Sequence, residues 1–70
     1  MKYADLARRL RELGCEEVRR SKGSHRIWRN TATGLVAVAP DWGSKDLAPG
    51  TIRGMLRELG ISREQFGPIK

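Results

Sequence analysis

The chain has 70 residues, of which 39% are hydrophobic and 31% charged, and its formal net charge is +6 at pH 7 with a sequence pI near 10.5. This length predicts one small domain over residues 1–70, and such a chain buries only about 60% of the surface that its unfolded form exposes, which leaves little room for a deep pocket. The positive charge favours a polyanionic partner, either nucleic acid or an acidic protein.

Several classes of protein do not fit this composition. No apolar run approaches the roughly 20 residues of a membrane-spanning helix, and the first residues lack the hydrophobic region of a signal peptide, so we expect a cytoplasmic protein without a membrane partner. Cys15 has no second cysteine with which to form a disulfide, and a single histidine supplies no zinc-ligand set. We therefore expect no metal and no small-molecule cofactor.

The first predicted element is an amphipathic helix. Its apolar residues recur at three- and four-residue steps, and charged residues fill the opposite face. The apolar positions are Tyr3, Leu6, Ala7, Leu10 and Leu13. Gly14 follows them, where a residue with positive φ commonly closes a helix, and Cys15 can supply the apolar contact that accompanies such a cap. Cys15 is therefore expected to be a packing residue.

Three short strands are predicted next. They span residues 16–21, 25–30 and 35–39. Lys22, Gly23 and Ser24 form the tight connection between the first two, and a turn ending at Gly34 connects the second to the third, which is rich in small and β-branched residues. Three consecutive antiparallel strands of this kind form a meander.

Alternation within the second strand predicts which side chains share a face. His25, Ile27 and Arg29 lie on one face, and Trp28, the largest apolar side chain of the strand, is expected to pack beneath the helices from the other. The side chains expected to pack with Trp28 are Val18, Val36 and Val38. Those expected on the open face with His25 are Ile27, Leu35 and Ala37. The alternative places Ile27, and His25 with it, against the helices.

A polar connection follows the third strand. Pro40 ends that strand because it has no amide hydrogen for the ladder, and residues 41–48 lead to the next element. Trp42 in this connection is expected to be a packing plug, because apolar residues are otherwise scarce. The alternative is an exposed platform on which a nucleobase stacks.

The second predicted helix begins at Pro49, where a missing amide hydrogen is tolerated, and ends at Gly60. Its buried stripe consists of Ile52, Met55, Leu56 and Leu59. Ser62 and Gln65 then fit a capping box for one last short turn, which brings Phe66 back onto the core.

The predicted fold is α+β, with the order α-β-β-β-α. Two helices pack on one face of a three-stranded antiparallel sheet and leave the other face bare. Double-stranded-RNA-binding domains share this layered arrangement. His25 is expected on the bare face.

The segment around His25 is the main candidate site. His25 is the one histidine of the chain, and Lys22, Arg26 and Arg29 surround it in sequence. Histidine gives or takes a proton near pH 7 most readily, and the planar fork of arginine pairs well with phosphate oxygens, so the combination suits chemistry on a phosphodiester. A surface or packing role for the histidine is the alternative.

Where such a phosphodiester belongs to RNA, cleavage by the neighbouring 2′-hydroxyl needs a base, stabilisation of charge on the phosphate, and a proton for the leaving 5′-oxygen. His25 is the candidate base, and positioned proton transfer contributes about 10²- to 10⁴-fold. Lys22 is favoured over Arg26 for the phosphate, because Arg26 points away from His25 in a regular strand. The amides of Gly23 and Ser24 or the Ser24 hydroxyl are further candidate donors. Water is the default proton source, and without clustered carboxylates we predict activity that survives chelation.

The chain resembles the HicA toxins of bacterial and archaeal toxin-antitoxin pairs, also called YcfA-like proteins. The resemblance covers nearly the whole chain. It is carried by the Leu-x-x-x-Leu helix, Lys22-Gly23-Ser24-His25, Trp28, the strand running into Pro40, Gly50-Thr51-Ile52, Gly60-Ile61-Ser62 and Phe66.

This resemblance implies a ribosome-independent mRNA interferase with a fold like that of double-stranded-RNA-binding domains. It implies that His25 is catalytic and that the partner is a HicB-like antitoxin, which masks His25 and represses the operon. The residues expected to contact mRNA are Lys22, Gly23, Ser24, Arg26 and Arg29. Many relatives carry further histidines where this chain has Arg26 and the pair Asp41-Trp42, so a mechanism with two imidazoles does not fit it.

Two other functions stay open from the residues alone. One is an RNA-binding module of the same fold that does not cut RNA. The other is a basic protein-interaction domain that receives an acidic partner. The sequence of a neighbouring gene discriminates, since a small acidic protein with a DNA-binding segment indicates a toxin-antitoxin pair.

Overall fold

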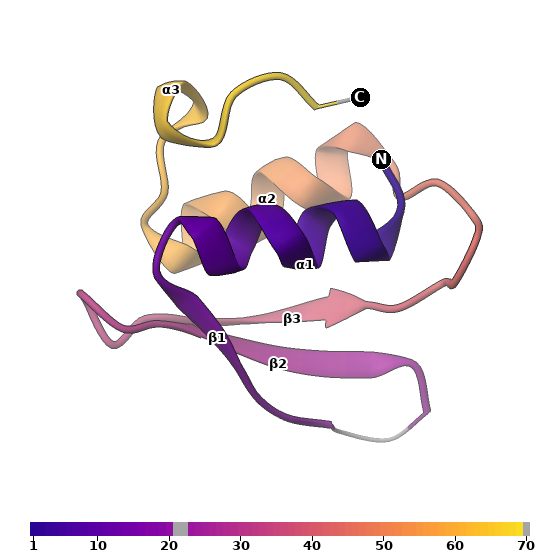
Figure 1. The fold of residues 1–70 in the computed structure, drawn as a ribbon, viewed down its shortest axis with the longest axis horizontal. Helices are drawn as coiled ribbons and strands as arrows, with labels where there is room; N and C mark the ends of the chain where they lie inside the picture. Colours follow the sequence, from indigo (N-terminus) through magenta and orange to yellow (C-terminus); the bar gives the residue numbers. More distant parts are fainter. Residues whose placement is uncertain (21–22, 70) are drawn as a thin grey trace.

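The computed structural model describes residues 1–20 and 23–69. The chain forms a helix, three antiparallel strands and two further helices, with α1 and α2 on the same side of the sheet (Figure 1). The elements are α1 (Tyr3–Glu12), β1 (Cys15–Arg20), β2 (His25–Asn30), β3 (Val36–Pro40), α2 (Pro49–Leu59) and α3 (Arg63–Phe66). This arrangement confirms the predicted α+β class and the order α-β-β-β-α.

The helix α1 forms where the apolar periodicity predicts it. Leu6, Ala7 and Leu10 are buried, with 4% exposure or less, because they share the face that meets the core. Gly14 follows the helix with a φ of 88°, and this conformation turns the chain into β1. Cys15 is 5% exposed, so its predicted packing role is confirmed, and burial raises the pKa of its thiol.

The sheet has the order β1-β2-β3, so β2 is its central strand. Trp28 is opposite Glu17 on β1 and Ala37 on β3, while His25 is opposite Pro40. In Figure 1 both long helices lie above the sheet, and α3 with the C-terminal segment lies above the helices. The lower face of the sheet is therefore left uncovered.

The hydrophobic core lies between the sheet and the helices. Trp28 is fully buried there, which confirms that it faces the helices. The buried apolar residues that form the core with it are Leu6, Ala7, Leu10, Cys15, Ala37, Ala39, Leu47, Ile52, Met55, Leu56, Leu59, Ile61 and Phe66.

The faces predicted for β3 are wrong. Val36 and Val38 are 53% and 50% exposed, whereas Ala37 and Ala39 are buried. The strand spans Val36–Pro40 rather than 35–39, and it does end at Pro40 as predicted. The physical reason is that α2 packs directly on β3, where the short alanine side chains leave room for both the helix and Trp28.

The inward placement of Val18 is also wrong, since this side chain is 50% exposed. The pairing between β1 and β2 shifts between Glu17 and Arg19, and such an irregularity breaks the simple alternation of side chains along a strand. The strand spans Cys15–Arg20 rather than 16–21, and Ser21 lies outside the described residues.

The C-terminal elements follow the local signals of the sequence. Gly60 ends α2 with a φ of 72°, a backbone conformation that favours glycine, and a Cβ atom there would lie 3.0 Å from Leu35 Cδ1. Ser62 and Gln65 form the predicted capping box of α3, and Phe66 is 2% exposed. Within the described residues, no helix combines the length and the apolar character that crossing a membrane requires.

Candidate functional site

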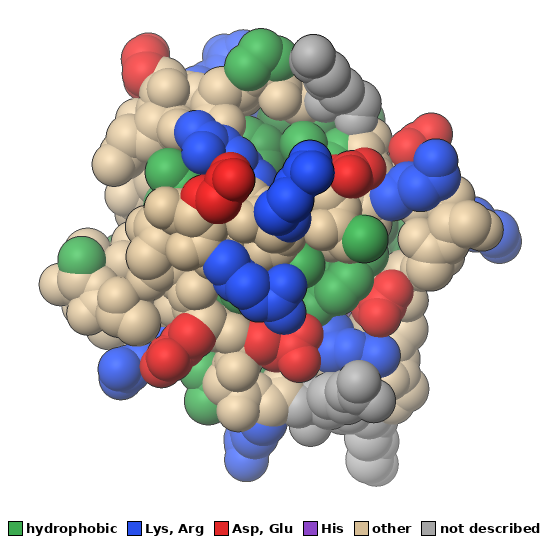
Figure 2. Space-filling view, in the orientation of Figure 1, with side chains coloured by type: hydrophobic (Ala, Val, Ile, Leu, Met, Phe, Trp, Pro, Cys, Tyr) green, Lys and Arg blue, Asp and Glu red, His purple; other side chains and the backbone are tan. Residues whose placement is uncertain are grey.

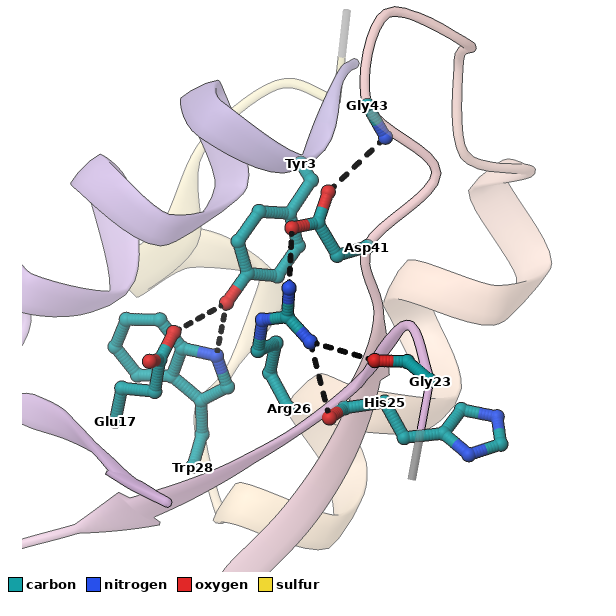
Figure 3. A network of polar contacts seen from close by, with 8 residues as sticks. All are labelled: Tyr3, Glu17, Gly23, His25, Arg26, Trp28, Asp41 and Gly43. Atoms are coloured by element: carbon teal, nitrogen blue, oxygen red, sulfur yellow. Dashed lines mark hydrogen bonds and ion pairs between the residues drawn. The ribbon is translucent and has the colours of Figure 1, made fainter. Parts of the chain in front are cut away.

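The side chain of His25 is exposed at the start of β2. It lies on the face opposite Trp28, so the helices that bury Trp28 leave the imidazole open to a partner. Figure 3 shows the ring pointing out of the neighbouring polar network, away from the guanidinium of Arg26. The imidazole is therefore exposed on the side of the strand away from this network.

Arg26 holds the backbone on either side of this position. Its Nη1 donates to the carbonyl oxygens of Gly23 at 3.1 Å and His25 at 3.4 Å, and its Nη2 donates to Asp41 Oδ2 at 3.2 Å (Figure 3). The Arg26 and Asp41 side chains are only 13% and 25% exposed, so this ion pair is screened less than a surface pair. The guanidinium thus crosslinks the start of β2 to the segment after β3.

Asp41 reinforces the same junction from the other strand. Its amide donates to the Ser24 carbonyl at 2.6 Å, and its Oδ1 accepts from the Gly43 amide at 3.0 Å. The second contact is the side-chain turn that aspartate commonly forms with the residue two positions on. Ser24 and His25 are therefore held in register with Pro40 and Asp41, and the imidazole projects from a fixed backbone.

The remaining predicted site residues are distributed as follows. Lys22 lies outside the described residues. Gly23 has a φ of 61°, and Ser24 is exposed. Arg29 lies on the same face as His25, where its Nε is 3.6 Å from Glu16 Oε1, and both side chains are about half exposed. Such an exposed ion pair contributes little stability, so the Arg29 guanidinium can leave Glu16 and pair with another anion.

The uncovered face of the sheet combines apolar side chains with arginines. Val36 and Val38, which are opposite Arg29 and Ile27 on β2, are each about half exposed. Arg19 is opposite Ile27 and shares its face, so this arginine joins Arg29 there. A surface of this kind suits a partner that offers both apolar groups and negative charge.

A second polar network lies on the helix side of the sheet. Trp28 Nε1 donates to the Tyr3 hydroxyl at 3.1 Å, and that hydroxyl donates to Glu17 Oε1 at 2.7 Å (Figure 3). Burial, together with the hydrogen bond to the Glu17 carboxylate, raises the pKa of Tyr3 to about 12. This chain of hydrogen bonds connects α1, β1 and β2 on the face of the sheet opposite His25.

Charges of both signs alternate on the face where α1 lies in front, as Figure 2 shows. On α1 itself, Arg9 pairs with Glu12 at 3.1 Å and Arg8 lies 3.7 Å from Asp5. These pairs offset part of the positive charge on that face. Among residues 1–20 and 23–69, no group of three or more histidine, cysteine, aspartate or glutamate residues is arranged to hold a metal ion.

Two features of this region were missed or misjudged from the sequence. The plug predicted at Trp42 is wrong, because this side chain is 47% exposed. The role of Asp41 was not predicted, although an aspartate two residues before Gly43 is a turn signal that could have indicated it. The pairing of Asp41 with Arg26 spans 15 positions of sequence, so no local pattern reveals it.

Of three comparisons with known proteins, one found a match. A search of curated proteins and a search of solved structures each found no match. A family model described as the HicA toxin of bacterial toxin-antitoxin matches residues 3–61, which include α1, all three strands and α2. The resemblance carried by the Lys22–His25 segment is thereby confirmed at the level of the family. This chain belongs to the HicA toxin family, whose members are the toxins of toxin-antitoxin systems and act with an antitoxin partner.

Proposed function

We propose that this toxin is a ribosome-independent endoribonuclease that cleaves mRNA with His25 as its general base and without a metal ion. The observation that carries the proposal is the exposure of the imidazole on the face that the helices leave uncovered. The match to the HicA family supports the toxin role. The fold supplies the basic, exposed sheet that a nucleic-acid partner needs.

The proposed reaction is a transesterification within the RNA chain. His25 takes the proton of a ribose 2′-hydroxyl while the 2′-oxygen attacks the adjacent phosphorus, and the bond from phosphorus to the 5′-oxygen breaks. Water donates the proton that the leaving 5′-oxygen needs. The products are a 2′,3′-cyclic phosphate and a 5′-hydroxyl end, so a substrate with a 2′-deoxy sugar at the cleavage position is resistant.

Other residues near the ring are assigned to binding and positioning. Lys22 and Arg29 are proposed to contact RNA phosphates, and the backbone of Gly23 with the Ser24 hydroxyl offers donors to the charge that develops on the phosphate. Arg26 already donates to Asp41 and to two carbonyl groups, so we assign it to orienting the strand that carries His25. Such orientation is a large part of catalysis by proton transfer.

The partner proposed for the uncovered face is a HicB-like antitoxin that covers His25. Exposed valines beside arginines favour a protein that contributes both apolar contacts and acidic side chains. Covering the imidazole excludes RNA from it, which explains neutralisation without any change in the toxin fold.

The first prediction concerns His25→Ala. Because the side chain is exposed and the backbone is held by Arg26 and Asp41, we expect this variant to keep the wild-type melting temperature and to lose cleavage of ribosome-free, single-stranded mRNA in EDTA. A loss of about 10²-fold or more is expected from removing the base. Added imidazole should restore part of the activity. The control is Arg57→Ala, which removes an exposed side chain from α2 on the other side of the sheet.

Each outcome separates the proposal from its alternatives. Cleavage by His25→Ala at the wild-type rate removes this residue from the mechanism. A wild-type protein that binds RNA but leaves it intact over hours is an RNA-binding module. A protein that neither binds nor cuts RNA, yet binds an acidic partner, is an interaction domain.

A further inference from the structure

The segment between β3 and α2 presents an unusual exposed aromatic group. Trp42 is 47% exposed, although a large aromatic side chain is normally placed in a core or an interface. With Lys45 it lines an open hollow of about 320 Å³. The other residues of 41–46 are polar or glycine, so no apolar side chain of this loop can pack against the indole.

This loop is fastened at both ends. At its start, Asp41 is bound to the Ser24 carbonyl and to Arg26. At its end, Asp46 forms a β-bridge with Lys2, and the Leu47 amide donates to the Met1 carbonyl at 2.8 Å.

The loop also has hydrogen bonds of its own. The Lys45 amide donates to the Trp42 carbonyl at 3.2 Å, and the Gly43 amide donates to Asp41 Oδ1 at 3.0 Å. The indole is therefore carried by an ordered turn, and a preorganised group loses little entropy when a ligand binds.

The charges of the loop leave one cation beside the indole. The Asp41 carboxylate is paired with Arg26 at 3.2 Å, and the Asp46 carboxylate lies 3.3 Å from the terminal amino group. Lys45 is exposed and, within the part of the chain that the structure describes, takes part in no ion pair. An aromatic platform next to a lysine of this kind suits a ligand that has a flat ring and a phosphate.

The register of the sheet places this platform close to His25. His25 is opposite Pro40, and directly opposed residues of antiparallel strands lie about 5 Å apart. Trp42 is two residues beyond Pro40, so the chain separates their Cα atoms by at most about 7.6 Å. The Cα atoms of Trp42 and His25 are therefore within about 13 Å of each other.

We infer that Trp42 is a stacking site for one unpaired base of the RNA substrate and that Lys45 contacts a neighbouring phosphate. The inference rests on the proposed nuclease function and adds to it the residues that seat a nucleotide near the scissile bond. Aromatic side chains bind single-stranded nucleic acid in this way because every base has a face that stacks. Lys45 beside the indole favours a ligand that has both a flat ring and a negative charge, and a protein contact at Trp42 is an outcome of the test below.

The test uses the His25→Ala variant, which keeps bound RNA intact, and two probes. One is a fully 2′-O-methylated, single-stranded hexaribonucleotide, and the other has the same length and phosphates but abasic sugars. Trp28 is fully buried, so quenching of the exposed tryptophan reports on Trp42. We expect the probe with bases to quench this emission and to bind more tightly than the abasic probe.

Substitutions then assign the effect. Adding Trp42→Ala should weaken binding of the base-containing probe by about 5- to 150-fold and leave the abasic probe unaffected, whereas Trp42→Phe should restore most of the loss. The matched control is Leu35→Ala, because Leu35 is 45% exposed and precedes β3 at the end of the strand far from His25. It should change neither affinity.

Equal affinities for the two probes, or RNA binding that Trp42→Ala leaves unchanged, overturn the inference. Loss of antitoxin binding without loss of RNA binding also overturns it, since Trp42 is then a protein contact.

The proposed function is tested separately from the stacking site. If the wild-type chain binds bases through Trp42 but cleaves no RNA, the nuclease proposal is wrong and the stacking site stands. If the wild-type chain cleaves RNA and Trp42→Ala leaves KM unchanged, the nuclease proposal stands and the stacking site is wrong.

Discussion

The hydroxyl of Tyr3 shows how a single polar atom connects three elements on the helix side of the sheet. It accepts a hydrogen bond from Trp28 Nε1 and donates one to Glu17, so it satisfies a fully buried donor and joins three elements. Among the described residues, every buried side-chain nitrogen or oxygen atom has a hydrogen-bond partner. Trp28 can therefore fill the core without the cost of an unpaired indole N–H.

The raised pKa of Tyr3 predicts a loss of stability at alkaline pH. The unfolded tyrosine releases its proton near pH 10, whereas the folded one holds it to about pH 12 because of burial and the Glu17 contact. Between these values the folded state binds more protons. The stabilisation is therefore complete below pH 10 and is lost as pH rises toward 12.

The chain has one tyrosine, so tyrosinate absorbance measures this group alone. We expect a midpoint near pH 12 in native protein and near pH 10 in denaturant. Tyr3→Phe should lower stability at neutral pH by about 1–3 kcal/mol, because the Trp28 donor loses its acceptor, and should weaken the alkaline loss. A native midpoint near pH 10 contradicts the hydrogen-bonded, buried hydroxyl.

At the scale of elements, α3 is a helix of four residues that cannot form by itself. Its start is closed by the capping box of Ser62 and Gln65. Its end is closed by Arg9 of α1, whose Nε donates to the Phe66 carbonyl at 2.8 Å and whose Nη2 donates to the Gln65 carbonyl at 2.7 Å. One side chain from the first helix thus seats the last one.

We predict that Arg9→Ala lowers the free energy of unfolding by about 1–3 kcal/mol, because two carbonyl groups lose charged donors. Arg8→Ala is the matched control on the same helix. Arg8 is 74% exposed and has only a 3.7 Å ion pair, so its removal should change stability by about 0.5 kcal/mol or less. Urea denaturation measures both values, and amide exchange at Phe66 reports on α3. Equal effects of the two variants contradict this role.

At the scale of the whole molecule, the charge is arranged unevenly. Acidic and basic side chains alternate over α1, as Figure 2 shows. On the uncovered face, Arg19 and Arg29 accompany His25, and within the described residues the one carboxylate paired with them is that of Glu16. The net charge of +6 attracts a polyanion, and the arginines on the uncovered face are placed to hold it beside the imidazole.

This arrangement predicts which arginines contribute to salt-dependent RNA binding. In the His25→Ala background, Arg29→Gln should weaken binding and reduce the slope of log K against log salt by about 0.7, the value for one phosphate contact on a single strand. Arg57→Gln removes the same charge from α2, on the helix side, and should leave the slope unchanged. Filter binding across a series of salt concentrations measures both. Equal changes in the two slopes place RNA elsewhere on the molecule.

Local patterns of the sequence determined much of this architecture. The period of the apolar residues, Gly60 at a positive φ, the capping box at Ser62 and the end of a strand at Pro40 each depend on a few neighbouring residues. Burial of Trp28 followed from its size alone, and that burial carried His25 to the opposite face. The element order and the exposed position of the candidate base were therefore predictable.

Only the tertiary structure decided the features that depend on distant segments. Whether valine or alanine of β3 faces the core depends on how closely α2 approaches, and the shift in pairing between Glu17 and Arg19 depends on the partner strand. The contact of Arg26 with Asp41 and the exposure of Trp42 arise where the ends of β2 and β3 meet. Sequence periodicity describes one element at a time, whereas these features depend on the space and partners that the other elements provide.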